Sequence, residues 1–197
     1  MHTILKSFVA AAAFGALSAH AGVILQDEIS AISQVNFYEP MGQSFRAEDA
    51  HIRFAFNYRP MNPGAPADTL RLRLVAGDGL DGNTLANVVF SIPQGFNGFY
   101  DVDFSTVSLT VGNLYTAVLS IPGSSAYWGA AFSTRDNPYD DGRAYLSGER
   151  ADSDYDMTFR VTPVAQVVPV DVPEPGSIAL LSLGLAGMGL YRRSKKN

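Results

Sequence analysis

The sequence of 197 residues contains no cysteine. This absence excludes disulfide bonds, thiol nucleophiles and thiolate metal sites, so the stability of the fold must come from an apolar core. Histidine is scarce as well, because His2 and His20 lie near the N-terminus and only His51 occurs further along. A Ser-His-Asp triad would need His51, and a zinc site built from several histidines is excluded. His51 opens an alternating apolar run, so we interpret it as a structural residue or one at the rim of the fold.

Positive charge is also scarce in the central region. Residues 22–175 contain nine basic residues, all of them arginine, and all 19 acidic residues, a net charge of −10 compared with −5 for the whole chain. Nucleic-acid binding needs a basic patch, so this composition argues against a nucleic-acid partner. An acidic domain of this kind can recruit divalent cations or can simply be soluble.

The N-terminal segment has the three parts of a secretory signal peptide. Lys6 precedes an apolar run over residues 8–17, and the small residues Ala19 and Ala21 then frame a cleavage site. We therefore expect residues 1–21 to be removed on export, leaving a mature chain that begins at Gly22.

The C-terminal segment combines a proline motif, an apolar stretch and a basic end. Pro173, Glu174 and Pro175 precede 16 uncharged residues, 176–191, and a basic tail over 192–197. As a helix the apolar stretch would be about 24 Å long, whereas the hydrocarbon core of a bilayer is roughly 30 Å thick. Basic residues beside an apolar helix favour the cytoplasmic face. We expect a transmembrane sorting helix with a cytoplasmic tail.

These residues, together with Arg192 and Arg193 after the apolar stretch, resemble a PEP-CTERM protein-sorting segment. The resemblance implies export, recognition by an exosortase, which is a membrane-embedded transpeptidase-like enzyme, and removal of the tail near the Pro-Glu-Pro motif. It also implies a Gram-negative bacterium that makes exopolysaccharide or biofilm. Because the helix is short, we expect temporary membrane anchoring followed by release or display at the cell surface.

Between the two ends, apolar and polar residues alternate with a period of two, which is typical of half-buried strands. The alternation covers residues 52–58, 70–74, 100–104 and 157–161. It predicts an all-β domain over residues 22–163, an antiparallel β-sandwich of jelly-roll type with nine or ten strands, followed by a linker over 164–175. An eight-stranded barrel is the alternative.

Glycine-containing turns punctuate this domain. Asn97-Gly98 and Gly112-Asn113 predict tight hairpins, and residues 77–83 predict a longer connection. The domain is also similar to carbohydrate-binding jelly rolls. That similarity is carried by residues 42–45, 70–74 and 156–160, and it transfers no binding site residue by residue.

Clusters of aspartate suggest a calcium site, since calcium takes six to eight oxygen ligands. The candidate ligands are Asp78, Asp81, Asp140, Asp141 and Asp154. The alternative is turn formation and solvation, because aspartate beside glycine is common in turns. No other cofactor is expected.

Three aromatic residues are candidates for stacking on a sugar ring, namely Trp128, Tyr127 and Tyr139. Aromatic residues of a sandwich more often belong to the core, and Trp128 heads an apolar run. On the strands, Arg71 and Arg73 are expected to pair with Asp101 and Asp103 across the sheet.

The sequence therefore favours a non-catalytic exported protein of the cell surface or extracellular matrix that is associated with exopolysaccharide. The alternative is a lectin-like carbohydrate-binding module, assisted by calcium. A glycoside hydrolase would need two carboxylates across a cleft. No flanking pattern separates Glu39, Glu48 or Glu149 from ordinary surface acids, so we expect no enzymatic activity.

Overall fold

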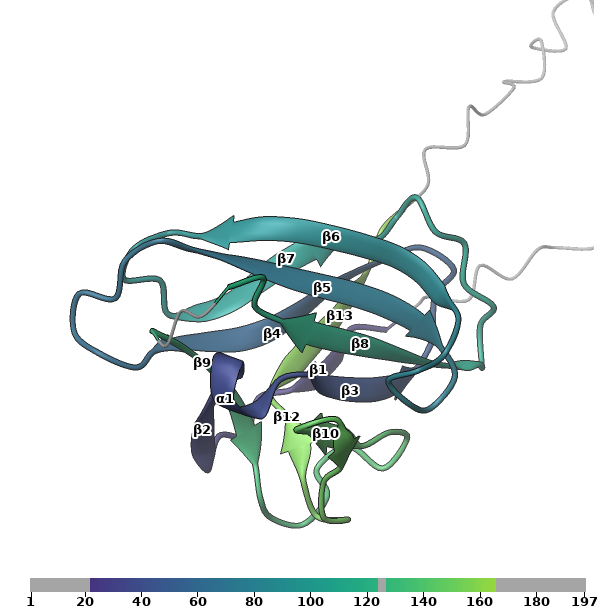
Figure 1. Ribbon diagram of the computed structural model, residues 1–197. Coiled ribbons are helices and arrows are strands. Elements are labelled where there is room, and N and C mark those ends of the chain that lie inside the picture. Colours follow the sequence, from purple (N-terminus) through teal and green to yellow (C-terminus); the bar gives the residue numbers. More distant parts are fainter. Residues whose placement is uncertain (1–21, 124–126, 166–197) are drawn as a thin grey trace, which may run out of the picture. The chain divides into compact units, whose positions relative to one another are not determined.

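The structure is a computed structural model that describes residues 22–123 and 127–165. These described residues form 13 strands and one short helix, α1 (Val35–Tyr38). The strands form two antiparallel sheets, as the β-sandwich prediction requires (Figure 1). The single closed barrel is not observed, because the strands of the described region divide between two sheets. The jelly-roll connectivity stays a prediction.

The first sheet is built around the long strand β4. One edge of β4 pairs with the whole of β7. The other edge pairs with β13 and then with β9, which also pairs with β2 and β12. Its strands are β1 (Ile24–Gln26), β2 (Ala31–Gln34), β4 (Ile52–Pro60), β7 (Gly98–Asp103), β9 (Trp128–Ser133), β12 (Asp156–Met157) and β13 (Phe159–Pro163).

The second sheet has the strand order β11, β10, β3, β8, β5 and β6. Its strands are β3 (Met41–Arg46), β5 (Asp68–Ala76), β6 (Thr84–Ile92), β8 (Leu114–Ser120), β10 (Ala144–Leu146) and β11 (Glu149–Arg150). Several strands span only two to four residues, too few for a period of two to show in a sequence. The sequence therefore underestimated the number of strands.

The apolar residues of each alternating run point between the two sheets. Phe54, Phe56 and Tyr58 of β4 are fully buried, as are Leu70 and Leu72 of β5. The burial of such side chains is the main favourable term in folding. The predicted inward faces of these runs are therefore confirmed.

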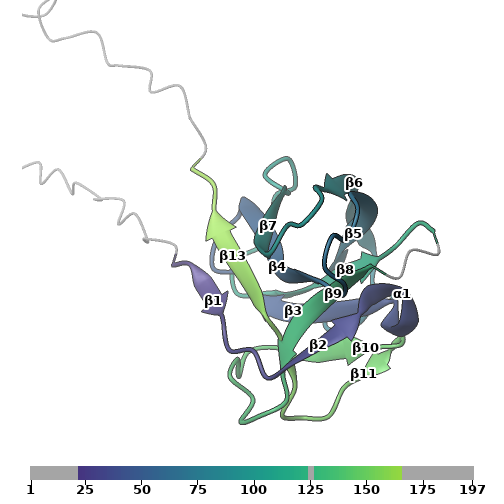
Figure 2. The same ribbon diagram turned by 90° about the vertical axis from the view of Figure 1, so that its left-hand side faces the viewer.

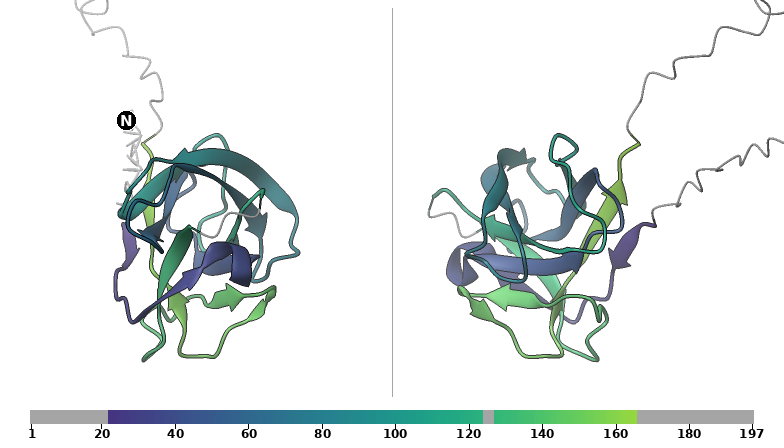
Figure 3. Two further views of the ribbon diagram at one scale, coloured as in Figure 1. Left: turned by 60° about the vertical axis from the view of Figure 1, so that its left-hand side comes forward. Right: turned by 90° about the vertical axis from the view of Figure 1, so that its right-hand side faces the viewer.

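One open side of the sandwich is covered where β6 of the second sheet approaches β7 of the first (Figures 1 and 3). Phe90 of β6 and Tyr100 of β7 stack there with ring centroids 5.0 Å apart. At the opposite edge of the first sheet, β1 pairs with β13, so Ile24 lies beside Val161 and the two ends of the described domain are neighbours (Figure 2).

Two of the predicted hairpins are wrong. Asn97-Gly98 connects β6 to β7, and Gly112-Asn113 precedes β8, but these consecutive strands belong to different sheets. The glycines do adopt the positive φ that tight turns need, 135° at Gly98 and 87° at Gly112. The longer connection over residues 77–83 joins the paired strands β5 and β6, so it is a true hairpin loop.

The predicted signal peptide, membrane helix and basic tail lie outside the described residues. Within the described part of the chain, no helix has the length and apolar character needed to cross a membrane.

Candidate functional site

The outer face of the first sheet carries a band of charged side chains across three strands. Residues of β4 that alternate with the buried aromatics, Arg53 and Ala55, point outward. The strand register places Arg160 of β13 and Asp101 of β7 on either side of Ala55. The next row along the same strands holds Arg53, with Thr162 of β13 on one side and Asp103 of β7 on the other. Each row therefore contains one guanidinium and one carboxylate.

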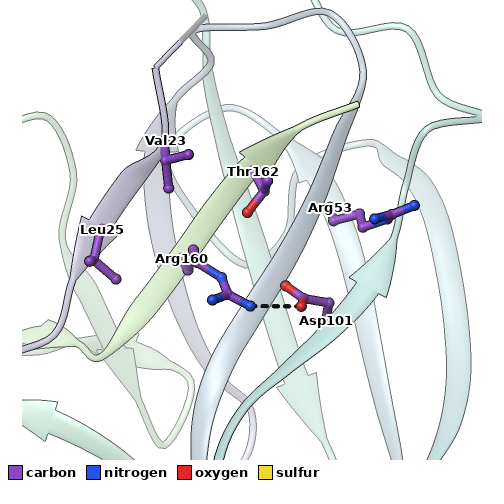
Figure 4. A pocket seen from close by; sticks show the side chains of 6 residues that line it. All are labelled: Val23, Leu25, Arg53, Asp101, Arg160 and Thr162. Atoms are coloured by element: carbon purple, nitrogen blue, oxygen red, sulfur yellow. Dashed lines mark hydrogen bonds and ion pairs between the residues drawn. The ribbon is translucent and has the colours of Figure 1, made fainter. Parts of the chain in front are cut away.

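Each row contains one ion pair. Arg160 Nη2 lies 2.7 Å from Asp101 Oδ2, a charge-assisted hydrogen bond (Figure 4). Arg53 Nε lies 3.8 Å from Asp103 Oδ2, a looser contact between two exposed side chains. The hydroxyl and backbone N–H of Ser105 lower the pKa of the Asp103 carboxyl, which keeps it charged at neutral pH.

Arg160 is held in place by more than this ion pair. Its guanidinium carbon lies 5.2 Å from the centre of the Phe99 ring, within the range of a cation–π interaction. Ala55 lies beneath, fully buried although it faces outward. Arg160 Nε is buried and has no hydrogen-bond partner among the described residues. This nitrogen is enclosed, so it is not open to a ligand in the groove.

Strand β1 and the residue that precedes it supply an apolar wall beside these charged groups. Val23 and Leu25 are 55% and 52% exposed, and Leu25 is paired in register with Arg160. The wall and the charged rows enclose an open groove of about 480 Å³. Figure 4 shows the six residues that line it: Val23, Leu25, Arg53, Asp101, Arg160 and Thr162. The groove offers donors, acceptors and an apolar surface to one ligand.

The sequence did not identify this groove. Asp101 and Asp103 pair with Arg160 and Arg53 rather than with Arg71 and Arg73, which lie on β5 of the other sheet. The predicted charge pairs are therefore wrong. The signal was present as charged residues at alternating strand positions, but the pairing depends on which strands are neighbours.

Three of the five predicted calcium ligands line one depression of about 140 Å³, namely Asp78, Asp140 and Asp141. Arg46 and Arg143 line the same depression. Asp141 pairs with Arg46 at 3.0 Å, and Asn137 donates a hydrogen bond to Asp140.

Asp78 is engaged more fully than the other two. Arg150 and Arg143 approach Asp78 Oδ2 at 2.9 and 3.7 Å, and the Tyr145 hydroxyl donates to Oδ1 at 2.7 Å. Partial burial raises the pKa of the Asp78 carboxyl, but these contacts outweigh it and the pKa falls below its usual value. Positive groups already balance this carboxylate.

Asp81 and Asp154 lie on the exposed surface. Across residues 22–123 and 127–165, no three acidic or histidine side chains are arranged to hold a metal ion. The structure thus brings Asp78, Asp140 and Asp141 together, and the calcium site stays a prediction.

The predicted stacking residues lie in different environments. Trp128 is fully buried, and its indole N–H donates to the Pro66 carbonyl oxygen at 3.1 Å, so neither ring face is open to a ligand. Tyr139 is half-buried, with its ring against Phe159 and its hydroxyl accepting the Arg46 backbone N–H. Tyr127 is 44% exposed. Of the three, only Tyr127 keeps a substantially open ring.

A buried carboxylate joins the two sheets beneath the loop that carries Asp140 and Asp141. Asp156 is fully buried, and it accepts hydrogen bonds from Gln43 Nε2 at 2.8 Å and from the Tyr139 backbone N–H at 3.0 Å. Burial raises the pKa of the Asp156 carboxyl to about 6. The alternation of Asp152, Asp154 and Asp156 in the sequence gives no sign that only the last of them is enclosed.

Several predicted functional residues fall outside the described region. These are Ala19 and Ala21 of the signal cleavage site and Pro173, Glu174, Pro175, Arg192 and Arg193 of the sorting segment. Gly22, expected to be the first mature residue, is exposed.

Comparison with known proteins bears on the C-terminal segment. Residues 171–196 match the family model of the PEP-CTERM protein-sorting motif. No curated protein and no solved structure matches the chain. The chain thus carries a PEP-CTERM sorting motif, which implies an exported protein that is sorted to the cell surface and processed by an exosortase.

Proposed function

We propose that this protein is a non-catalytic component of the cell surface whose β-domain binds extracellular polysaccharide. The observation that carries this proposal is the open groove on the outer face of the first sheet, which combines paired charges, a threonine hydroxyl and two exposed aliphatic side chains. Polyhydroxylated ligands need hydrogen-bond donors and acceptors close to an apolar surface. The sorting motif supports the setting, because an exported protein meets such polymers.

Absence of catalysis is part of the proposal. A hydrolytic general acid needs a raised pKa and access to the substrate. Asp156 has a pKa raised to about 6, but its side chain is enclosed between the sheets. Asp101, the carboxylate among the six lining residues, is engaged in an ion pair with Arg160. No carboxylic acid in the groove is thus suited to protonate a leaving group.

The finer details of location belong to the same proposal. We expect the segment over residues 176–191 to anchor the precursor temporarily in the inner membrane of a Gram-negative bacterium, with residues 192–197 in the cytoplasm. Exosortase processing then transfers the domain to the exopolysaccharide or biofilm.

The lectin-like alternative is favoured by the groove, whereas assistance by calcium is not. Arginine and asparagine side chains engage the three carboxylates around Asp78, Asp140 and Asp141. We therefore expect polysaccharide binding to be unchanged by a chelator.

The test is co-sedimentation of the purified full chain with insoluble polysaccharides and with exopolysaccharide from a producing strain, with and without chelator. Binding to at least one polymer is expected. Failure to sediment with any of them would refute polysaccharide binding. Hydrolysis products released from a bound polymer would instead refute the non-catalytic assignment.

A further inference from the structure

Each guanidinium of the groove has a carboxylate beside it. Arg160 is paired with Asp101, which also lines the groove, and Arg53 has Asp103 as its neighbour at 3.8 Å, just outside the lining. A carboxylate or sulfate group that approached either guanidinium would also approach the aspartate beside it. Repulsion from that aspartate would cancel most of the attraction.

The charge of the rest of the domain also disfavours anionic ligands. With nine basic and 17 acidic residues over 22–163, the domain is negatively charged as a whole at neutral pH. A field of this sign slows the approach of a polyanion and lowers its concentration near the surface. Uncharged ligands are unaffected by it.

The hydrogen-bonding groups suit hydroxyls. Each aspartate oxygen can accept more than one hydrogen bond, so Asp101 can bind a hydroxyl while it keeps its contact with Arg160. The Thr162 hydroxyl also lines the groove, and a hydroxyl can both donate and accept a hydrogen bond. The apolar wall at Val23 and Leu25 can then cover the C–H face of a sugar ring.

Ala55 lies between Arg160 and Asp101 in the first row. Its short side chain is fully buried and leaves the space above it to the paired side chains of Arg160 and Asp101.

We propose that this groove binds neutral sugar residues of a polysaccharide, with hydroxyls on Arg160, Asp101 and Thr162 and the apolar face of the ring against Leu25 and Val23. This inference rests on the proposed polysaccharide-binding function and adds to it the ligand class and the residues of the site.

The test compares neutral dextran and laminarin with anionic alginate and polygalacturonate in affinity electrophoresis of the full chain. Two variants probe the groove. Thr162→Val keeps the shape and removes the hydroxyl, and Val23→Ser removes part of the apolar wall. The control is Val89→Ser on β6 of the other sheet, since Val23 and Val89 are both 55% exposed.

We expect a neutral polymer to bind with little dependence on salt. Loss of one hydrogen bond corresponds to a two- to tenfold reduction in affinity, roughly, and this is expected for Thr162→Val, with a reduction of similar size for Val23→Ser. Val89→Ser should bind like the wild type. Unchanged urea midpoints would show that the variants remain folded.

Each other outcome overturns a different part. If a neutral polymer binds and both groove variants retain full affinity, the groove is not the site, although polysaccharide binding stands. If only the anionic polymers bind, and salt abolishes this binding, the neutral ligand class is wrong. If no polymer binds, the proposed function itself fails, and this inference fails with it.

Discussion

The buried carboxylate of Asp156 should make the domain more stable in mild acid than at neutral pH. Its folded-state pKa is raised from 3.8 to about 6 by burial, the largest effect. Between these two values the folded state binds one proton more than the unfolded state. The free energy of unfolding should therefore fall by about 1.4 kcal/mol for each unit of increasing pH in this interval.

The magnitude follows from the width of the interval. Above about pH 6 the carboxylate is ionised in both states, and the folded state carries the whole penalty, about 3 kcal/mol for a shift of roughly two units. Between pH 7.5 and pH 4.5 the expected gain in stability is about 2 kcal/mol.

Carboxylates with lowered pKa act in the opposite direction but at lower pH. Asp78 and Asp103 have folded-state pKa values below 3.8. Their stabilising contribution is complete above the unfolded value and is lost only as pH falls through the folded one. Between pH 4.5 and 7.5 their contribution to stability is nearly constant, so the pH dependence caused by Asp156 can be measured.

The measurement is urea unfolding of the full chain at half-unit steps from pH 4.5 to 7.5, for the wild type, Asp156→Asn and Asp154→Asn. Asp154 is exposed and controls for the loss of one negative charge. Asp156→Asn should remove most of the pH dependence, although its amide can accept only one of the two hydrogen bonds from Gln43 and Tyr139. The reasoning is refuted if the wild type is equally stable across this range, or if Asp156→Asn retains the same slope.

Two further substitutions test how the core and one loop are packed. The Tyr58 hydroxyl is buried and lacks a hydrogen-bond partner among the described residues, so Tyr58→Phe should leave the free energy of unfolding unchanged or raise it by about 1 kcal/mol; a loss of more than 1 kcal/mol would show that the hydroxyl is satisfied. A side chain at Gly142 would collide with the Ser44 carbonyl group, whereas one at Gly123 would meet open space. Gly142→Ala should therefore lower the free energy of unfolding in urea by about 1–3 kcal/mol. Gly123→Ala should change it by less than about 0.5 kcal/mol. Equal effects would contradict the close packing of this loop on β3.

Local patterns predicted the class of the fold and the inward faces of its strands. Phe54 and Phe56 are buried and Arg53 is exposed because successive side chains of a strand point to opposite faces. The same patterns failed at the turns. Gly98 has the conformation of a turn, but whether the next strand pairs with the previous one or crosses to the other sheet depends on packing over the whole domain.

The candidate site shows the same division. Trp128 was correctly favoured as a core residue, because it heads an apolar run. The groove was missed, since Asp101 and Arg160 are 59 positions apart in the chain and become neighbours only because β7 and β13 both pair with β4.

The sequence by itself determined the sorting motif, the all-β class and the acidic charge of the domain, because each depends on the kind and order of neighbouring residues. Only the tertiary structure decided which charges pair, which aspartate is enclosed and where the groove lies. Those properties depend on distances between strands that are remote in sequence, and only the packing of the two sheets sets these distances.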